Sequence, residues 1–369
     1  MSYRVLHIAS DDLWGGAEVQ VSQQVKALRE REIDAQVLVF NDGDLKRYCE
    51  HQSIPCTLVS EAQGFIRFFR NCLSAVRAQS AQIVVSHGYK EAIVALVVHL
   101  YLQVAWISVF HGSSEAYTGL RQLKAVFYQF IARLSSRVFS NRILVVSNSL
   151  KKDLHFANLE KVDVVFNTTD SCETGEGSSL TNLHHPAVAI VGRLVAVKDI
   201  TTALLCFEQL CDLARENALE EPHLYVIGEG PEQDRLQALR KSLRCSSAVS
   251  FLGFQCAAVR YIATADALLI SSLSEGIPTV LLEALAHRTP VVASNVGGIG
   301  EVRDIVGEQV VRLVPPGDVI GFSQALFDLL YKKQGELFNE KTTAAMAKHF
   351  SPTASAEKLD EVYQKILAG

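Results

Sequence analysis

Glu275 and Glu283 are the residues whose type and spacing most clearly suggest chemistry. Glu275 lies in a Gly-Pro loop after the apolar run 267–272, and Glu283 lies in the helix predicted to follow. A carboxylate accepts two hydroxyls at once, which suits the diols of sugars and ribose. The helix, predicted to begin near Pro278 and Thr279, would aim backbone amides at an anion. Taken alone, either glutamate also fits an ordinary surface or helix-stabilising position.

Two cations follow another short apolar run. Arg193 comes directly after residues 187–192, and Lys198 follows five residues later. An arginine fork and a lysine point charge just past a strand end suit a diphosphate. A solvated basic loop is the alternative interpretation.

Glycines stand at two further strand ends. Gly15 and Gly16 follow the first apolar run and precede a helix. Gly228 is the last residue of the run 223–228, and Gly230 comes two residues later. Without side chains, such positions let backbone amides approach a phosphate or a sugar. A plain tight turn explains them equally well.

His111 directly follows the apolar run 104–110. A lone histidine is more often structural than catalytic, but the end of a strand is where a residue of the site belongs. The two interpretations stay open.

These positions need a scaffold, and the sequence predicts one. Short β-branched runs without polar alternation recur between helical segments, which indicates parallel sheets covered on both faces. The runs predicted as strands are 4–9, 35–40, 82–86, 104–110, 142–147, 187–192, 223–228, 249–253, 267–272 and 290–294. The fold class is therefore α/β, with two doubly wound domains facing a cleft.

The stretch 171–186 is rich in Gly, Ser and Thr and poor in apolar residues, so we interpret it as the interdomain linker. It separates a first domain at 1–172 from a second at 186–350. A last helix, predicted over 353–367 after Pro352, is expected to dock on the first domain.

Composition excludes several classes of protein. With 369 residues, 49% hydrophobic and 20% charged, the chain can form large cores, which rules out global disorder. A net charge of −5 argues against nucleic-acid binding. Eight cysteines without a CxxC pair indicate reduced thiols, and the N-terminus does not resemble a signal peptide, so we expect a cytoplasmic enzyme.

Residues 92–110 carry no charge and have the length of a membrane span. His99 and Gln103 fall near its middle, where polar groups are costly, so we predict a buried helix followed by a strand.

Charge is unevenly divided along the chain. Residues 1–172 carry a net +2 and the remainder −7. Between Ala116 and Lys152 there is no acidic residue, and in 119–142 the basic residues alternate with aromatic ones. A basic amphipathic helix of this kind can lie on an anionic membrane surface, although a core helix with a solvated basic face fits equally well.

Taken in order, these motifs resemble the retaining GT-B glycosyltransferases of family 4. The most specific of them is the E-x7-E segment SEGIPTVLLEAL. The motifs that carry the resemblance are GGAE at 15–18, VFHG at 109–112, GRLVAVKD at 192–199, VIGEGP at 226–231, VSFLGF at 249–254 and SEGIPTVLLEAL at 274–285. Asn167-Thr168-Thr169-Asp170 and Gly300 depart from the family pattern without removing a proposed catalytic group.

The resemblance implies a role for each matching residue. Arg193 and Lys198 would neutralise the donor diphosphate, Glu283 would hold the ribose, and Glu275 would contact hydroxyls of the donor sugar. His111 would lie by the sugar near its anomeric centre. The remaining donor-binding positions are Gly15 and Gly16 at the phosphates, Gly228, Phe254 beside the base, and the backbone of Gly276, Ile277, Pro278, Thr279 and Val280.

The implied reaction is metal-independent, retaining transfer from a nucleotide-diphosphate sugar, such as a UDP-sugar, to a glycan or lipid-linked acceptor. Cell-surface polysaccharide, lipopolysaccharide or glycolipid synthesis is the expected setting, with peripheral membrane contact through 119–142. Donor sugar, base and acceptor stay open. The alternatives are a sugar-nucleotide epimerase or hydrolase of the same fold and a non-enzymatic two-domain sugar-binding protein.

Overall fold

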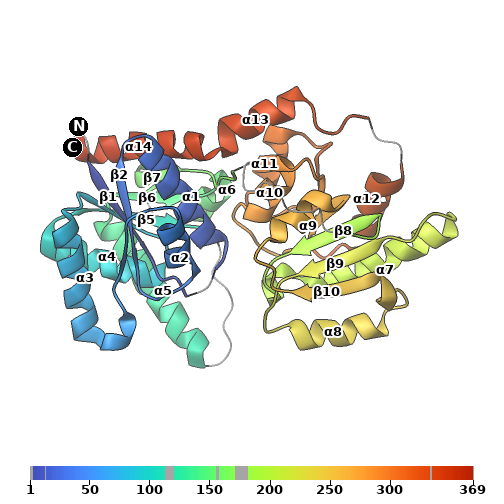
Figure 1. Cartoon of the computed structure of the whole chain (residues 1–369), viewed down its shortest axis with the longest axis horizontal. Coiled ribbons are helices and arrows are strands. Elements are labelled where there is room, and N and C mark those ends of the chain that lie inside the picture. The colour runs from blue at the N-terminus through green and yellow to red at the C-terminus, as the bar shows by residue number, and fades with distance from the viewer. Residues whose placement is uncertain are drawn as a thin grey trace. The chain divides into compact units, whose positions relative to one another are not determined.

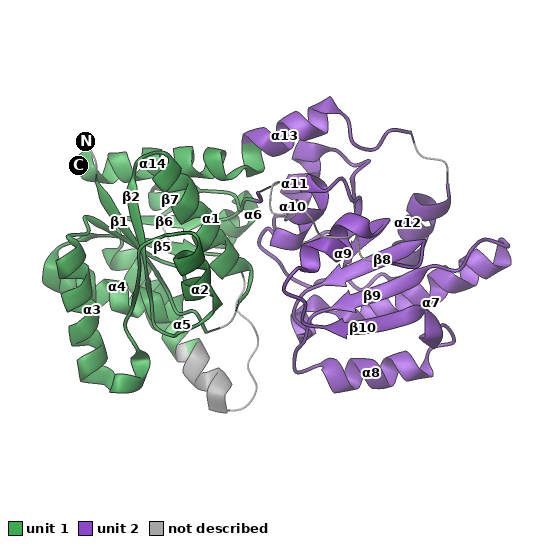
Figure 2. Cartoon of the chain, viewed as in Figure 1, with its two compact units in different colours: residues 1–112, 117–168, 349–369 green, residues 113–116, 169–348 purple. Residues whose placement is uncertain are grey.

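The structure is a computed structural model that describes residues 3–12, 14–112, 120–154, 158–170, 182–332 and 335–368, without the side chains of 120–125 and 127. The chain divides into two compact units (Figure 2). Unit 1 comprises residues 1–112, 117–168 and 349–369, and unit 2 comprises 113–116 and 169–348. Most of the predicted linker, 171–181, lies outside the described residues.

Unit 1, whose strands β1, β2, β5, β6 and β7 are labelled in Figure 1, is built on a seven-stranded sheet. Its strand order is β3-β2-β1-β4-β5-β6-β7, with every described pair parallel. Its strands are β1 (Arg4–Ala9), β2 (Asp34–Val39), β3 (Cys56–Leu58), β4 (Ile83–Ser86), β5 (Ala105–Phe110), β6 (Arg142–Val145) and β7 (Val162–Val164). Its helices are α1 (Gly16–Glu30), α2 (Asp44–His51), α3 (Phe65–Gln79), α4 (Tyr89–Leu102), α5 (Leu120–Phe139), α6 (Asn148–Asp153) and α14 (Pro352–Ala368), with short 3-10 turns η1 (Glu61–Gln63) and η2 (Leu159–Lys161).

Unit 2 repeats this plan with a six-stranded parallel sheet in the order β10-β9-β8-β11-β12-β13. Its strands are β8 (Ala187–Val191), β9 (His223–Ile227), β10 (Val249–Gly253), β11 (Ala267–Ile270), β12 (Val291–Ser294) and β13 (Val311–Val314). Its helices are α7 (Ile200–Glu216), α8 (Gln233–Ser242), α9 (Ala258–Thr264), α10 (Thr279–Ala286), α11 (Ile299–Val306), α12 (Val319–Tyr331) and most of α13 (Glu340–Phe350), with η3 (Ala196–Lys198) and η4 (Ser246–Ala248). The prediction of two parallel α/β domains is confirmed.

The C-terminal helix returns to the sheet on which the chain begins. α14 packs on α1, and its side chains Leu359, Val362 and Tyr363 are buried in the same core as Val5 of β1. Pro352 is its first residue, a position where proline loses no hydrogen bond. The last residues of the chain therefore help to shape the core of unit 1.

The uncharged segment 92–110 forms most of α4 and all of β5. Strand β5 lies inside the sheet of unit 1, and Leu100 and Tyr101 at the end of α4 are exposed rather than buried. Among the described residues, no helix combines the length and the apolar character needed to cross a membrane. The seven cysteines that the structure describes are all free thiols.

The predicted basic helix is shorter than the segment 119–142. α5 ends at Phe139, and the chain then turns, because the side chain of Asn141 accepts a hydrogen bond from the backbone of Trp106. Arg142 already belongs to β6, which agrees with the strand predicted over 142–147. Gly119 lies outside the described residues.

Candidate active site

The strand order of unit 2 reverses between β8 and β11, which are hydrogen-bonded neighbours. Ligands of open parallel sheets bind outside the carboxyl ends of the strands at such a switch point. The loop after β8 carries Arg193 and Lys198, and the loop after β11 carries Ser272 and Glu275. The topology therefore brings two predicted charged loops together.

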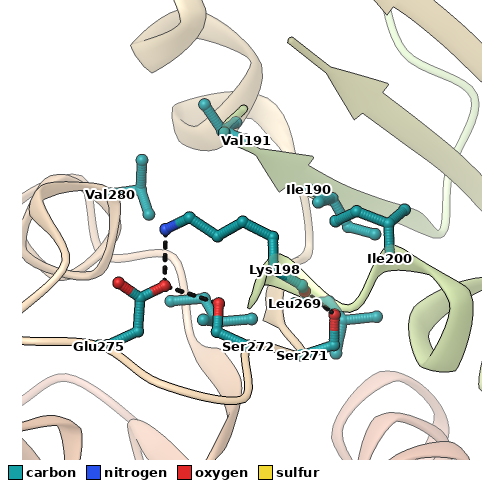
Figure 3. A pocket seen from close by; sticks show the side chains of 11 residues that line it. Ile190, Val191, Lys198, Ile200, Leu269, Ser271, Ser272, Glu275 and Val280 are labelled. Atoms are coloured by element: carbon teal, nitrogen blue, oxygen red, sulfur yellow. Dashed lines mark hydrogen bonds and ion pairs between the residues drawn. The ribbon is translucent and has the colours of Figure 1, made fainter. Parts of the chain in front are cut away.

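Lys198 and Glu275 meet directly. The Nζ atom of Lys198 lies 2.6 Å from Oε1 of Glu275, and the hydroxyl of Ser272 donates to the same oxygen at 2.6 Å (Figure 3). The hydroxyl of Ser271 fixes the Lys198 backbone by donating to its carbonyl oxygen at 2.9 Å. With 26% and 11% of their side chains exposed, Lys198 and Glu275 remain reachable while partly shielded from water.

The pair forms one wall of a small pocket whose other lining is mostly apolar. The pocket holds about 280 Å³ of space, its open mouth included, less than a pocket for a whole drug-sized ligand. Its size suits one charged group and its hydroxyl neighbours. Besides the pair, it is lined by Ile190, Val191, Gly192, Ile200, Leu269, Ile270, Ser271, Ser272 and Val280.

Two glycines allow the backbone to pack closely against these loops. A Cβ atom on Gly228, whose φ is +135°, would lie 1.9 Å from the carbonyl oxygen of Gly192. A Cβ atom on Gly297, whose φ is +54°, would lie 1.8 Å from the carbonyl oxygen of Glu275. Gly228 thus lacks a side chain because the loop after β8 occupies that space, and its predicted contact with the donor stays a prediction.

Helix α10 begins beside the pair. Pro278 is its N-cap and provides no side-chain cap, and in the first turn the amide of Leu281 donates to the carbonyl oxygen of Pro278 at 3.2 Å. Gly276, Ile277 and Pro278 are buried, whereas Thr279 and Val280 are partly exposed. Glu283 follows Thr279 by four residues and so lies on the same face of the helix.

Arg193 and Phe254 mark two further edges of the site in unit 2. Arg193 is partly exposed in the loop that leads from β8 to Lys198. Phe254 follows β10 with half of its side chain exposed, and its amide donates to Oε1 of Glu229 at 3.2 Å. An exposed ring at a strand end is free to stack on a base.

In unit 1, Gly15 is the N-cap of α1 and its amide donates to Oε2 of Glu18 at 3.1 Å. The Gly15 amide predicted to meet a phosphate is therefore already bonded, while Gly16 is the exposed first residue of the helix. Burial, with repulsion from Glu91 and Asp11, raises the pKa of Glu18 to about 7, although its hydrogen bonds oppose this.

His111 is the end of a line of three histidines. Its Nε2 atom lies 3.1 Å from Nδ1 of His87, and Nε2 of His87 lies 2.9 Å from Nδ1 of His7. Burial lowers the pKa of His111 to about 4 and that of His7 to about 3, so both rings are neutral near pH 7. The expectation of a lone histidine is therefore wrong.

Two family models match consecutive parts of the chain. The model described as Glycosyltransferase Family 4 matches residues 14–171, and the model described as Glycosyl transferases group 1 matches residues 185–332. The chain belongs to the family 4 glycosyltransferases. The resemblance to family 4 that was inferred from the motifs is thereby confirmed.

Curated relatives of this glycosyltransferase match part of its length. N-acetyl-alpha-D-glucosaminyl L-malate synthase of Bacillus anthracis is 31% identical over 39% of the chain, and the lipopolysaccharide core biosynthesis glycosyltransferase LpsE of Rhizobium meliloti is 32% identical over 38%. The matched segment spans only 38% of the length of each relative.

Solved structures share the whole fold. Anabaena HepE in complex with UDP and glucose has a TM-score of 0.79 at 17% identity, and the match covers 98% of this chain and all of the other. The lipopolysaccharide outer core galactosyltransferase WaaB has a TM-score of 0.69 at 17% identity over 99% of this chain. This glycosyltransferase therefore has the GT-B fold of two Rossmann-like domains.

Sequence reasoning missed several residues of the glycosyltransferase site. Ser271 and Ser272 close the run read as a strand, and serines at a buried strand end were a signal for polar contacts there. Gly297 stands in a Gly-Gly pair after β12, the same pattern that drew attention to Gly15. His7 gave no such signal because it lies within an apolar strand, but His87 directly follows the predicted strand 82–86 and so carried the same signal as His111.

Proposed function

We propose that this glycosyltransferase transfers a sugar from a nucleoside diphosphate sugar to a glycan or lipid-linked acceptor in cell-surface glycan synthesis. The observation that carries the proposal is the Lys198–Glu275 pair at the switch point of unit 2, beside the uncapped start of α10. The names of the relatives, which include lipopolysaccharide and teichuronic acid glycosyltransferases, support the setting, and UDP in HepE supports a uridine donor.

The reaction separates charge. As the bond between the anomeric carbon and the diphosphate oxygen breaks, the sugar gains positive charge and the diphosphate gains negative charge. Lys198 and Arg193, together with the amides of Thr279 and Val280, would stabilise the leaving diphosphate. Preorganised donors of this kind are each worth about 3–4 kcal/mol in barrier height.

Glu275 is suited to the sugar. Both of its contacts in the described structure fall on Oε1, and Oε2 makes neither. When a diphosphate competes for the ammonium of Lys198, the Glu275 carboxylate is released to accept sugar hydroxyls. Glu283, one turn along α10, would take the ribose, and Phe254 would stack on the base.

We propose that the anomeric configuration is retained and that the diphosphate is neutralised by protein cations rather than by a metal. Membership of the family supports retention, and the two cations Arg193 and Lys198 in the loop after β8 support metal independence. The product's anomeric proton coupling, followed by NMR from the first turnover, tests retention: an inverted first product contradicts it. Full activity in excess EDTA is the expected result for metal independence, and activity that returns only with added Mg²⁺ contradicts it.

We propose peripheral contact with the cytoplasmic membrane face through α5. Val126, Phe130, Leu134 and Val138 are exposed at four-residue intervals, with the exposed Arg133 beside them. Apolar side chains flanked by cations on one helix face suit anionic lipid, which also fits a lipid-linked acceptor.

Sedimentation with vesicles of phosphatidylglycerol and phosphatidylcholine tests this contact. Phe130→Ser with Leu134→Ser is expected to abolish binding at low salt, whereas Ile320→Ser, which removes an equally exposed apolar side chain from unit 2, is expected to leave it unchanged. Absence of binding by the unmodified protein at low salt would overturn the proposal.

A thermal-shift series with UDP, GDP, ADP and dTDP tests the function most economically. A nucleotide at a hundred times its dissociation constant stabilises the protein by about 2.7 kcal/mol. One of the four is expected to raise Tm, and its sugar conjugates then identify the donor in a transfer assay. No shift with any nucleotide would contradict the proposed donor site.

A further inference from the structure

A line of hydrogen bonds runs through unit 1 from its C-terminal helix to His111. The hydroxyl of Tyr363 on α14 lies 3.4 Å from Nε2 of His7, and the line continues through His87 to His111. His7 lies within β1, while His87 and His111 directly follow β4 and β5, the next two strands of the sheet. The rings of neighbouring histidines are nearly parallel, with interplanar angles of 19° and 25° and centroids 5.1 and 5.3 Å apart.

The line has two ends of different character. Tyr363 and His7 are fully buried, and within the described residues the Tyr363 hydroxyl has His7 as its hydrogen-bond partner. At the other end, Nδ1 of His111 is buried and has no hydrogen-bond partner in the described part of the chain. The side chain of His111 as a whole is partly exposed at the carboxyl end of β5.

Neutral imidazoles carry one proton each, so all bonds in the line must point the same way. If Tyr363 donates to His7, each ring donates from Nδ1, and the unused donor is Nδ1–H of His111. If the line runs in reverse, the unused donor is the hydroxyl of Tyr363, sealed in the core. A buried donor without an acceptor costs about 1–3 kcal/mol, and only at His111 could a ligand oxygen satisfy it. The first direction is therefore favoured.

We propose that Tyr363, His7 and His87 are positioning residues that hold His111 as a neutral hydrogen-bond donor, its proton on Nδ1, for an oxygen atom of the sugar substrate. This inference rests on the proposed function. It also explains why His111 should be neutral. The sugar gains positive charge as its bond to the diphosphate breaks, so a cationic histidine beside the sugar would raise the barrier. A neutral N–H group orients the sugar without that penalty.

The tautomer can be observed directly. Long-range ¹H–¹⁵N NMR of protein labelled at histidine separates Nδ1–H, Nε2–H and cationic rings, and His111→Gln assigns the signal of His111. At pH 7 the unmodified protein is expected to show His111 as Nδ1–H. An Nε2–H or a cationic His111 would overturn the proposal, and this measurement requires no destabilising variant.

Tyr363→Phe keeps the ring and removes the hydroxyl that begins the line. It is expected to mix the His111 tautomers and to lower kcat about tenfold, with KM for the donor changed less than twofold. Tyr3→Phe is the matched control, because the hydroxyl of Tyr3 donates to Asp360 and the Tyr3 ring also packs on Tyr363. Equal effects of the two variants on kcat and on the tautomer would contradict the proposal.

The two proposals fail separately. If His111 carries its proton on Nδ1 but no nucleotide sugar supports sugar transfer, the proposed function is wrong while the assignment of the hydrogen-bond line stands. If transfer is observed and His111 carries its proton on Nε2, the positioning role is wrong and the function stands.

Discussion

Lys198 and Glu275 are 77 residues apart in sequence, and their side chains form an ion pair of 2.6 Å at the switch point of unit 2. The two charges compensate each other in the structure without a ligand. A diphosphate that binds Lys198 must therefore displace the Glu275 carboxylate or share the Lys198 ammonium with it. Donor binding is thus coupled to the release of Glu275.

Glu275→Gln should separate binding from turnover. The amide keeps the size of the side chain and can still accept from Ser272, but it no longer neutralises Lys198. We expect nucleoside diphosphate affinity to stay the same or rise by up to about fivefold, since a partly exposed pair is worth at most about 1 kcal/mol. Turnover should fall by about a hundredfold or more.

Calorimetry and initial rates measure the two effects, with Glu216→Gln, at an exposed glutamate of unit 2, as control. Parallel losses of binding and turnover would contradict the assignment of Glu275 to the sugar.

Gly228→Ala should destabilise unit 2 strongly. Its Cβ would strike the Gly192 carbonyl, and its φ of +135° is unfavourable for alanine. Gly317→Ala provides the comparison, because φ there is +78° but nothing lies within 4 Å of the added atom. We expect about 1 kcal/mol of lost stability for Gly317→Ala and about 3 kcal/mol or more for Gly228→Ala in urea unfolding. Equal losses would show that the contact with Gly192 does not matter.

His7 should make unit 1 sensitive to acid. Burial lowers its pKa to about 3, whereas an unfolded histidine titrates near 6.5. The unfolded chain thus binds more protons, so this contribution to stability is present above pH 6.5 and is lost as pH falls toward 3. Below pH 6.5, the unfolding free energy of His7→Gln should fall less steeply with decreasing pH than that of the unmodified protein. The two slopes should differ by up to about 1.4 kcal/mol per pH unit. His51→Gln, at an exposed histidine of α2, is the control. An unchanged acid slope in His7→Gln would show that His7 is not buried as a neutral ring.

Glu18 should affect the pH dependence of stability in the direction opposite to His7. Its pKa is raised to about 7, above the ordinary value for glutamate, so the folded protein binds more protons. The stabilising contribution is complete below about pH 4.5 and is lost as pH rises through 7. Replacing it as Glu18→Gln should therefore flatten the decline in stability between pH 5 and 7.5, measured by urea unfolding at each pH. Glu30→Gln, on the exposed face of α1, should keep the decline of the unmodified protein; a decline that persists in Glu18→Gln would contradict the raised pKa.

The sequence predicted the inner strands because they are buried on both faces and read as continuous apolar runs. It did not predict β3, β7 and β13, which have three or four residues each and lie at sheet edges. These three edge strands are short and have one partner each, so their apolar pattern is too weak to recognise. The edge strand β10, with five residues, was predicted as 249–253.

For the site, the sequence predicted which residues follow strands, because parallel topology places strand ends together. It could not predict that Lys198 pairs with Glu275 or that His7 meets His87, because contacts between residues 77 and 80 positions apart leave no local pattern. It likewise could not predict that Gly228 packs against the loop after β8, since a glycine that admits a ligand and one that admits another loop look the same in sequence.

The central claim is that the Lys198–Glu275 site binds the diphosphate of a nucleotide sugar. Calorimetric titration of the unmodified protein, Lys198→Ala and Lys241→Ala tests it most directly, using whichever of UDP, GDP, ADP and dTDP gives the largest thermal shift. Lys241 is an exposed lysine of α8 in the same unit. We predict that Lys198→Ala weakens binding by about 10- to 100-fold, as expected for a lost charged hydrogen bond, while Lys241→Ala binds like the unmodified protein. Equal affinities for Lys198→Ala and the unmodified protein would contradict the account.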